Sequence, residues 1–196
     1  MAQKPCLGAG MVAGAVGGLV AAWVMNVFME NAGPKVQQVA QKFDHSPQQQ
    51  PSQSLSSSDS EPKEDATMKT ADAIVSAVTG GRHLSLEAKQ KGGPIVHYVF
   101  GALMGALYGM GAEYSSTVRS GFGTAFGSAL FAGADLWAVP ALGLSGSSSD
   151  APISSLATPF SAHLVFGATT EGVRRLLRAI ARRQRTANGL QLTANS

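Results

Sequence analysis

The sequence predicts an all-α integral membrane protein built as a bundle of four transmembrane helices. Charged residues make up only 14% of the 196 residues, well below the roughly 25% that is usual in soluble domains. The 23 glycines lie mostly inside long uncharged segments, where small residues let membrane helices approach one another closely. Several of these segments reach the roughly 17–25 residues that are needed to span a hydrocarbon core.

The four predicted spans cover residues 7–29, 94–112, 121–144 and 153–170. The first has no charged residue and is longer than the apolar core of a signal peptide, which is roughly 7–15 residues. We therefore expect a retained helix there in preference to a cleaved signal. The fourth is the least apolar, because Pro159 and His163 lie within it.

Lysine and arginine in short flanks predict the orientation of the spans. Residues 145–152 contain neither and are expected outside, whereas Arg119 fits an inside loop. Six arginines follow the fourth span: Arg174, Arg175, Arg178, Arg182, Arg183 and Arg185. Such a block is compatible with nucleic acid, but after an apolar span it favours a topology anchor. Both termini are thus expected in the cytoplasm.

The remaining segments divide the chain into parts that differ in composition. Residues 1–43 hold the first span and its flank, 44–66 form a disordered Pro/Gln/Ser linker, 94–181 hold spans two to four, and 182–196 form a cytoplasmic tail. Residues 67–93 are predicted to form two short amphipathic helices on the outer face, the alternative being a half-ordered loop. Helical spacing supports the first of them, in Met68, Ala71, Ile74, Val75 and Val78.

Small residues recur at every fourth position of the spans. Nine glycines are predicted to pack helices together: Gly10, Gly14, Gly18, Gly101, Gly105, Gly109, Gly123, Gly127 and Gly167. Without a hydrophobic drive between helices in lipid, close approach and dispersion must supply the attraction. The expected partners are the bilayer itself and either further copies of the chain or other membrane proteins, with no nucleic acid.

The chain also shows an internal match. The run from His97 to Ala102, HYVFGA, resembles HLVFGA from His163 to Ala168. Gly10, Gly14 and Trp23 are similarly spaced to Gly123, Gly127 and Trp137, with a one-residue offset at the tryptophan. This order predicts two duplicated helix hairpins, although helices rich in alanine and glycine also match by chance.

Four ionisable residues fall in or beside the spans: His97, Asp135, His163 and Glu171. An aspartate at mid-helix costs at least roughly 2.5–3.5 kcal/mol on insertion scales, so it is expected to face other helices or water. Histidine titrates near neutral pH, which favours a proton-responsive helix face. The alternative is ordinary interhelical hydrogen bonding, such as Asp135 to Ser128 or Trp137. A metal site is disfavoured by the ligand spacing.

No enzymatic motif is present. The sequence has no phosphate-binding loop, no GxSxG, no HExxH and no cysteine besides Cys6. We therefore expect no catalytic residue, no metal and no cofactor.

Several of these residues together resemble the YagU-like family of small bacterial inner-membrane proteins. The resemblance rests on the His97 run and the span ending at Glu113, on Pro140-Ala-Leu-Gly-Leu, and on the His163 run followed by Glu171 and Arg174-Arg175. It covers roughly 8–30 and 67–180 but not the linker. It implies a multi-pass inner-membrane location and a role in tolerance of acid, and it carries over no catalytic residue.

Two functions follow from the sequence. The first is a membrane protein without enzymatic activity that acts in envelope or acid-stress homeostasis through its His/Asp/Glu face. The second is a structural or assembly subunit of a larger membrane complex that docks through glycine-rich faces. A proton-responsive path needs its polar residues to converge, whereas a docking subunit needs a glycine face turned outward.

Overall fold

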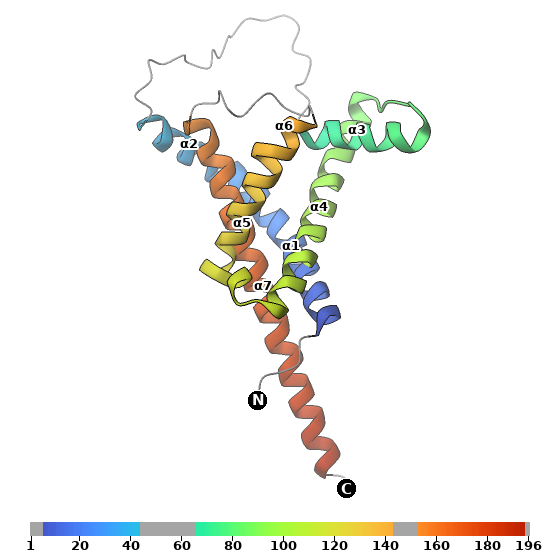
Figure 1. Cartoon of the computed structure of the whole chain (residues 1–196), viewed down its shortest axis with the longest axis vertical. Helices are drawn as coiled ribbons and strands as arrows, with labels where there is room; N and C mark the ends of the chain where they lie inside the picture. The colour runs from blue at the N-terminus through green and yellow to red at the C-terminus, as the bar shows by residue number, and fades with distance from the viewer. Residues whose placement is uncertain (1–5, 44–65, 143–152, 195–196) are drawn as a thin grey trace, which may run out of the picture.

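The computed structural model describes residues 6–43, 66–142 and 153–194, and within these ranges the chain is helical without strands. The predicted linker and the 145–152 loop lie outside the described residues, except for Ala66. The long segments run alternately up and down (Figure 1). They are α1 (Leu7–Asn31), α4 (Leu86–Tyr114), the segment Thr117–Ala141 and α7 (Ile153–Ala194).

Three segments of the described chain are long and apolar enough to cross a membrane: Leu7–Asn31, Leu86–Tyr114 and Thr117–Ala141. This composition is that of a membrane protein. The predicted fourth span, within α7, is not in this set. Its first turns carry several Ser and Thr residues besides His163, and arginines follow them, so its mean hydropathy falls.

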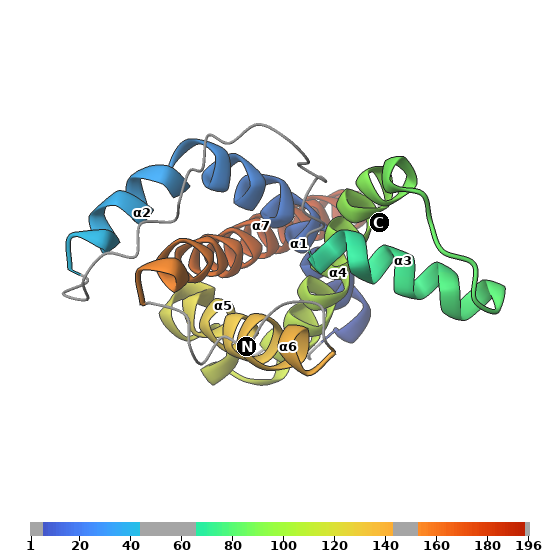
Figure 2. The same cartoon turned by 90° about the horizontal axis from the view of Figure 1, so that it is seen from above.

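The helices pack in a row. α1 contacts both α4 and α7, and α7 contacts α5 (Thr124–Phe131), so α1 and α7 occupy the middle of the molecule when it is seen from above (Figure 2). The apolar core lies between them at Ala21, Ala22 and Phe166. We call the end of the molecule that holds the start of α1 and the end of α4 the lower end, as drawn in Figure 1.

Two short helices extend sideways at the upper end (Figures 1 and 2): α2 (Gly33–Gln41) and α3 (Ala66–Thr79). Met68 and Ala71 of α3 are buried, and they contact Gly93 and Gly92 at the start of α4. The predicted amphipathic helix is therefore present at this place. Ile74, from the same predicted stripe, is 52% exposed.

Asp72 fastens α3 to the link before α4. Its carboxylate accepts a hydrogen bond from the backbone N–H of Leu84 at 2.6 Å and lies 2.9 Å from His83 Nδ1. Lys89 Nζ is 3.3 Å away. The Leu84 bond, followed by the His83 contact, lowers the pKa of Asp72 from 3.8 to about 2.

The second predicted amphipathic helix is not separate, which corrects the expected boundary at residue 93. α4 begins at Leu86, where the Ser85 hydroxyl accepts a bond from the Ala88 N–H as an N-cap, and it continues through Pro94 to Tyr114. Proline removes a single N–H from the helix, and in α4 the helix continues past that gap.

The third predicted span is also not a regular helix. A 3₁₀ segment, η1 (Thr117–Gly123), precedes α5, and a π-helical segment, η2 (Ala132–Ala138), leads into the short α6 (Val139–Ala141). Pro140 follows this wide turn and has no N–H to donate one turn back. π-Helical turns are rare in proteins, and those that occur are often found at functional sites.

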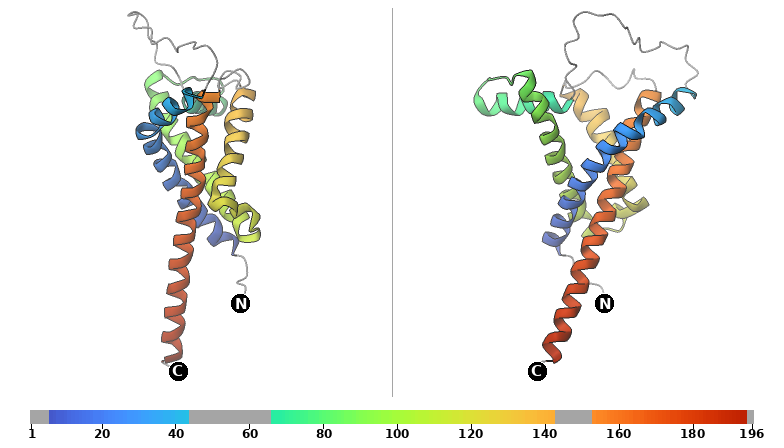
Figure 3. Two further views of the ribbon diagram at one scale, coloured as in Figure 1. Left: turned by 90° about the vertical axis from the view of Figure 1, so that its left-hand side faces the viewer. Right: turned by 180° about the vertical axis from the view of Figure 1, so that it is seen from behind.

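The last helix is the longest, with 42 residues. Its upper half lies among the other helices and its lower half projects alone beyond them (Figures 1 and 3). The predicted tail from residue 182 is thus helical as far as Ala194.

Candidate functional site: two polar clusters between the helices

Glycines bring α1 and α4 into backbone contact. A Cβ placed on Gly14 or Gly18 would lie under 3.0 Å from the carbonyl oxygen of Gly105 or Gly101, respectively. Gly10 lies in the same way against Gly109 and the Glu113 side chain. The six glycines predicted on these two helices thus face each other inside the chain.

A second crossing joins the start of α5 to α7. A Cβ on Gly123 would meet the Gly167 carbonyl oxygen, and one on Gly127 would meet that of His163, each under 3.0 Å. When the two crossings are superimposed by their glycine contacts, Glu171 of α7 falls on Glu113 of α4. The HxVFGA sequence match instead aligns Glu171 with Gly105, which lies two helical turns from Glu113. The two alignments disagree. The predicted duplication is therefore not confirmed.

The first polar cluster is ionic and lies between the helices at the lower end. Glu171 of α7 is fully buried. Its carboxylate accepts hydrogen bonds from the Tyr108 hydroxyl at 2.9 Å, from Arg174 Nε at 2.7 Å and from Arg175 Nε at 2.5 Å. A buried carboxylate is costly unless it is paired and hydrogen-bonded, and here both of its oxygens are occupied.

Glu113 extends this cluster to the end of α4. Its side chain is 8% exposed, and it lies 3.3 Å from Arg174 Nη1 and 2.6 Å from Arg178 Nη2. Arg174 therefore bridges the two glutamates and joins α4 to α7. We call Tyr108, Glu113, Glu171 and Arg174 the ionic cluster.

Phe122 of η1 covers the outer side of this cluster. The guanidinium carbon of Arg175 lies 4.6 Å from the centroid of the Phe122 ring, at cation–π distance. Phe122 has a φ of 55°, between Gly121 and Gly123, which are also left-handed. A non-glycine residue in this region costs roughly 1–2 kcal/mol, so the ring contact helps to offset local strain.

The second cluster joins η2 to α7 nearer the upper end. Asp135 Oδ2 lies 3.7 Å from His163 Nδ1, and the two side chains are 36% and 9% exposed. The Phe131 ring packs against the histidine at 5.6 Å between centroids. The π-helical turn thus sets a carboxylate, open to its surroundings, beside a buried imidazole.

The hydrogen bonds of His163 fix its tautomer. Nδ1 lies 2.9 Å from the Pro159 carbonyl oxygen, which only accepts, so Nδ1 carries a hydrogen. Nε2 is then the nitrogen that gains a proton.

Of the four predicted polar residues, the structure brings together Asp135 and His163. Glu171 belongs to the ionic cluster, eight residues or about 12 Å further along α7. His97 lies on α4, in edge-on contact with Tyr98 at 5.8 Å between centroids. Its link to the Asp135–His163 pair remains a prediction.

Sequence reasoning missed most of the ionic cluster. Arg174, Arg175 and Arg178 were assigned to topology alone, and Tyr108 was not singled out. One signal was present: Glu113 follows Gly109 on the glycine stripe of α4, as Glu171 follows Gly167 on α7. Two carboxylates at the ends of packing stripes require buried cations.

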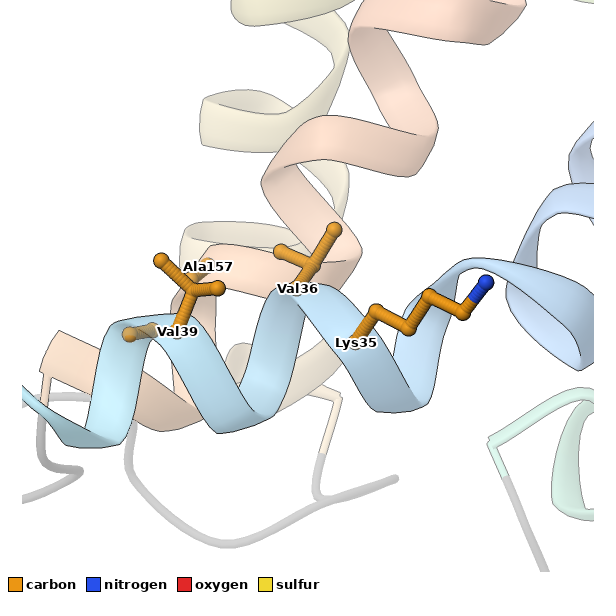
Figure 4. A pocket seen from close by; sticks show the side chains of 5 residues that line it. Lys35, Val36, Val39 and Ala157 are labelled. Carbon is orange, nitrogen blue, oxygen red and sulfur yellow. The ribbon is translucent and has the colours of Figure 1, made fainter.

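Two further features are simpler. A groove of about 410 Å³ between α2 and α7 is lined by Lys35, Val36, Val39, Ala40 and Ala157. Its wall is aliphatic, and the Lys35 ammonium points along α2, away from the valines (Figure 4). In the described parts of the chain, no three His, Cys, Asp and Glu side chains are grouped to hold a metal ion.

The fold and its clusters define a class of protein: an all-helical chain with three segments able to span a membrane and two polar clusters between its helices. Comparison with protein-family models, curated proteins and solved structures gives no match.

Proposed function

We propose that the chain is a four-span membrane protein without enzymatic activity, and that its Asp135–His163 pair responds to protons in acid-stress or envelope homeostasis. The observation that carries the proposal is the 3.7 Å approach of these side chains across the α5–α7 contact. Histidine is the side chain whose charge changes between roughly pH 5 and 8. A change of charge at a helix contact is a way to bias the packing of two helices.

The surroundings of the pair support this role. α1 carries no titratable side chain between Leu7 and Met29, so Asp135 is the carboxylate that faces His163. The next charged groups along α7, Glu171 and its arginines, are ion-paired with one another in the ionic cluster, eight or more residues from His163. Proton binding at His163 therefore changes the charge of its own contact without a second titrating acid beside it.

Four spans in place of three are supported by the packing of α7. Its upper half lies among the other helices (Figure 3), and α7 contacts both α1 and α5. Its polar residues face inward: Thr170 and Glu171 are fully buried and His163 is 7% exposed. Inward-facing polar groups make a span tolerable despite low mean hydropathy. With four spans, the lower end and its arginines face the cytoplasm of a bacterial cell.

The alternative, an assembly subunit that docks through glycine faces, has less support. The glycines of both crossings contact backbone of this same chain. They are therefore engaged inside the chain and not turned toward a partner. The resemblance to the YagU-like family likewise supports acid tolerance.

Acid survival of cells tests the proposal, and proton flux into vesicles shows whether the pair conducts protons or only senses them. The full chain, reconstituted in sealed vesicles with a pH-sensitive dye inside, is compared with Asp135→Asn and His163→Gln, and acid survival is measured in cells carrying each variant. We expect both variants to be expressed and to lose acid protection, with or without a loss of flux. The control is His83→Gln, which changes a histidine that is 72% exposed on the upper end. Full acid protection in both variants would refute the proposal.

A further inference from the structure

The lower end carries more positive charge than its acids neutralise. Seven arginines lie on η1 and the lower half of α7: Arg119, Arg174, Arg175, Arg178, Arg182, Arg183 and Arg185. Glu113 and Glu171 of the ionic cluster pair with three of them: Arg174, Arg175 and Arg178. Among these residues, positive charges therefore outnumber negative charges by five.

Two of these arginines, Arg175 and Arg119, are open on one side, whereas the Arg178 side chain is only 14% exposed. Arg175 uses Nε for Glu171 and is 51% exposed, so the rest of its guanidinium faces outward beside Phe122. Arg178 uses one nitrogen for Glu113, while its Nε is buried without a hydrogen-bond partner among the described residues. Arg119, on the same 3₁₀ segment as Phe122, is exposed.

Arg175 and Arg178 lie close enough together along α7 to reach the same headgroup layer. Arg175 and Arg178 follow Glu171 by four and seven residues, which is about 6 and 11 Å along a helix. The headgroup layer is roughly 5–8 Å thick on each side of the hydrocarbon. Apolar side chains are exposed at the same level, with Phe122 at 47%, Tyr114 at 64% and Leu176 at 60%.

We propose that Arg119, Phe122 and Arg175 form a binding face for the phosphate headgroup of an anionic phospholipid in the inner leaflet. The proposal rests on the four-span orientation proposed above. Guanidinium groups donate in a planar fork that fits phosphate oxygens, and Phe122 and Leu176 offer contact to the upper acyl chain. Binding of a water-soluble protein would not explain why aromatic rings are exposed beside these arginines.

The test uses the full chain in neutral detergent, with phosphatidylglycerol or phosphatidylcholine added to the micelles. The thermal unfolding midpoint is measured as a function of lipid. We expect phosphatidylglycerol to raise the midpoint more than phosphatidylcholine does. Arg119→Gln should require about fivefold more phosphatidylglycerol for the same rise. Arg175→Gln should behave alike, but it also leaves Glu171 with one partner fewer, so Arg119→Gln is the cleaner variant.

The matched control is Arg82→Gln, the same change at an exposed upper-end arginine, and it should respond as the wild type does. Equal effects of the two lipids, an unchanged response in Arg119→Gln, or an equal loss in Arg82→Gln would each overturn the proposal. So would the same rise with inorganic phosphate alone, which would assign the face to free phosphate. Asp135→Asn should keep the full lipid response, so a failure of the proton proposal stays distinguishable from a failure of this one.

Discussion

Glu113 near the end of α4 and Arg174 near the middle of α7 meet 3.3 Å apart, with side chains 8% and 6% exposed. They come from helices that both pack against α1, and they join α4 to α7 together with the Tyr108–Glu171 and Arg178–Glu113 contacts. Arg174 also holds the fully buried Glu171. The lower end of the molecule therefore depends on a small set of charges that must all be present together.

Removing one of these charges should destabilise the fold strongly. Glu171→Leu leaves Arg175 without a carboxylate and Arg174 with Glu113 alone, and it should cost roughly 3–5 kcal/mol. The control is Glu87→Gln, which breaks an exposed pair with Lys91 on α4 and should change stability by less than about 1 kcal/mol. Reversible unfolding of both variants in detergent measures the difference. Similar losses in the two would show that the ionic cluster is not structural.

Glycine packing should be position-specific along α4. A methyl group on Gly105 meets the backbone of Gly14 and Gly18, whereas one on Gly111 meets only Val118 side-chain atoms at 3.5 Å or beyond. Gly105→Ala should therefore cost roughly 1–3 kcal/mol through forced separation of the helices. Gly111→Ala should be neutral or slightly stabilising, because alanine favours helix. Thermal unfolding of the two alanine variants measures the contrast, and equal stability would argue against the crossing.

The upper end should loosen in acid at Asp72. Its pKa is lowered to about 2 from an ordinary value of 3.8. A carboxylate with a lowered pKa stabilises the folded state above its ordinary value and loses that effect as the pH falls through the folded value. Protection of the Leu84 amide from hydrogen exchange should thus be constant above about pH 4 and fall toward pH 2. Asp72→Asn should lose this dependence, and a wild-type profile in the variant would exclude the contact.

Topology separates four spans from three. A reporter fused after Ser196 should be active only if it works in the cytoplasm, and one inserted near Ser56 only if it works outside. Three spans would place the chain ends on opposite sides. Because three spans would also place Ser56 and Ser196 on the same side of the membrane, signals from both reporters on one side would remove the basis for four spans.

Much of the helical arrangement was predictable from the sequence. Long uncharged runs predict membrane-spanning helices, and glycine at every fourth position predicts that two helices pack closely. The break at Gly121–Gly123 and the π-helical turn before Pro140 were not, since both depend on how α5 meets α7. The Asp135–His163 contact depends on that turn. Residue types alone identified the candidate polar residues but not which of them contact each other. The ionic cluster was missed for a similar reason. Arginines that follow an apolar segment are interpreted as a topology signal, and the sequence alone does not show that a glutamate from another helix pairs with them.

Trp137 offers the most direct test of the proton-responsive pair. It lies two residues after Asp135 on the π-helical segment and is 73% exposed. Its emission, recorded in lipid vesicles on a Trp23→Phe background, should show a transition between roughly pH 5 and 8. We expect the transition to vanish in both Asp135→Asn and His163→Gln and to persist in His83→Gln. A flat profile in the parent protein, or a transition that survives in both variants of the pair, would mean that Asp135 and His163 do not respond to protons.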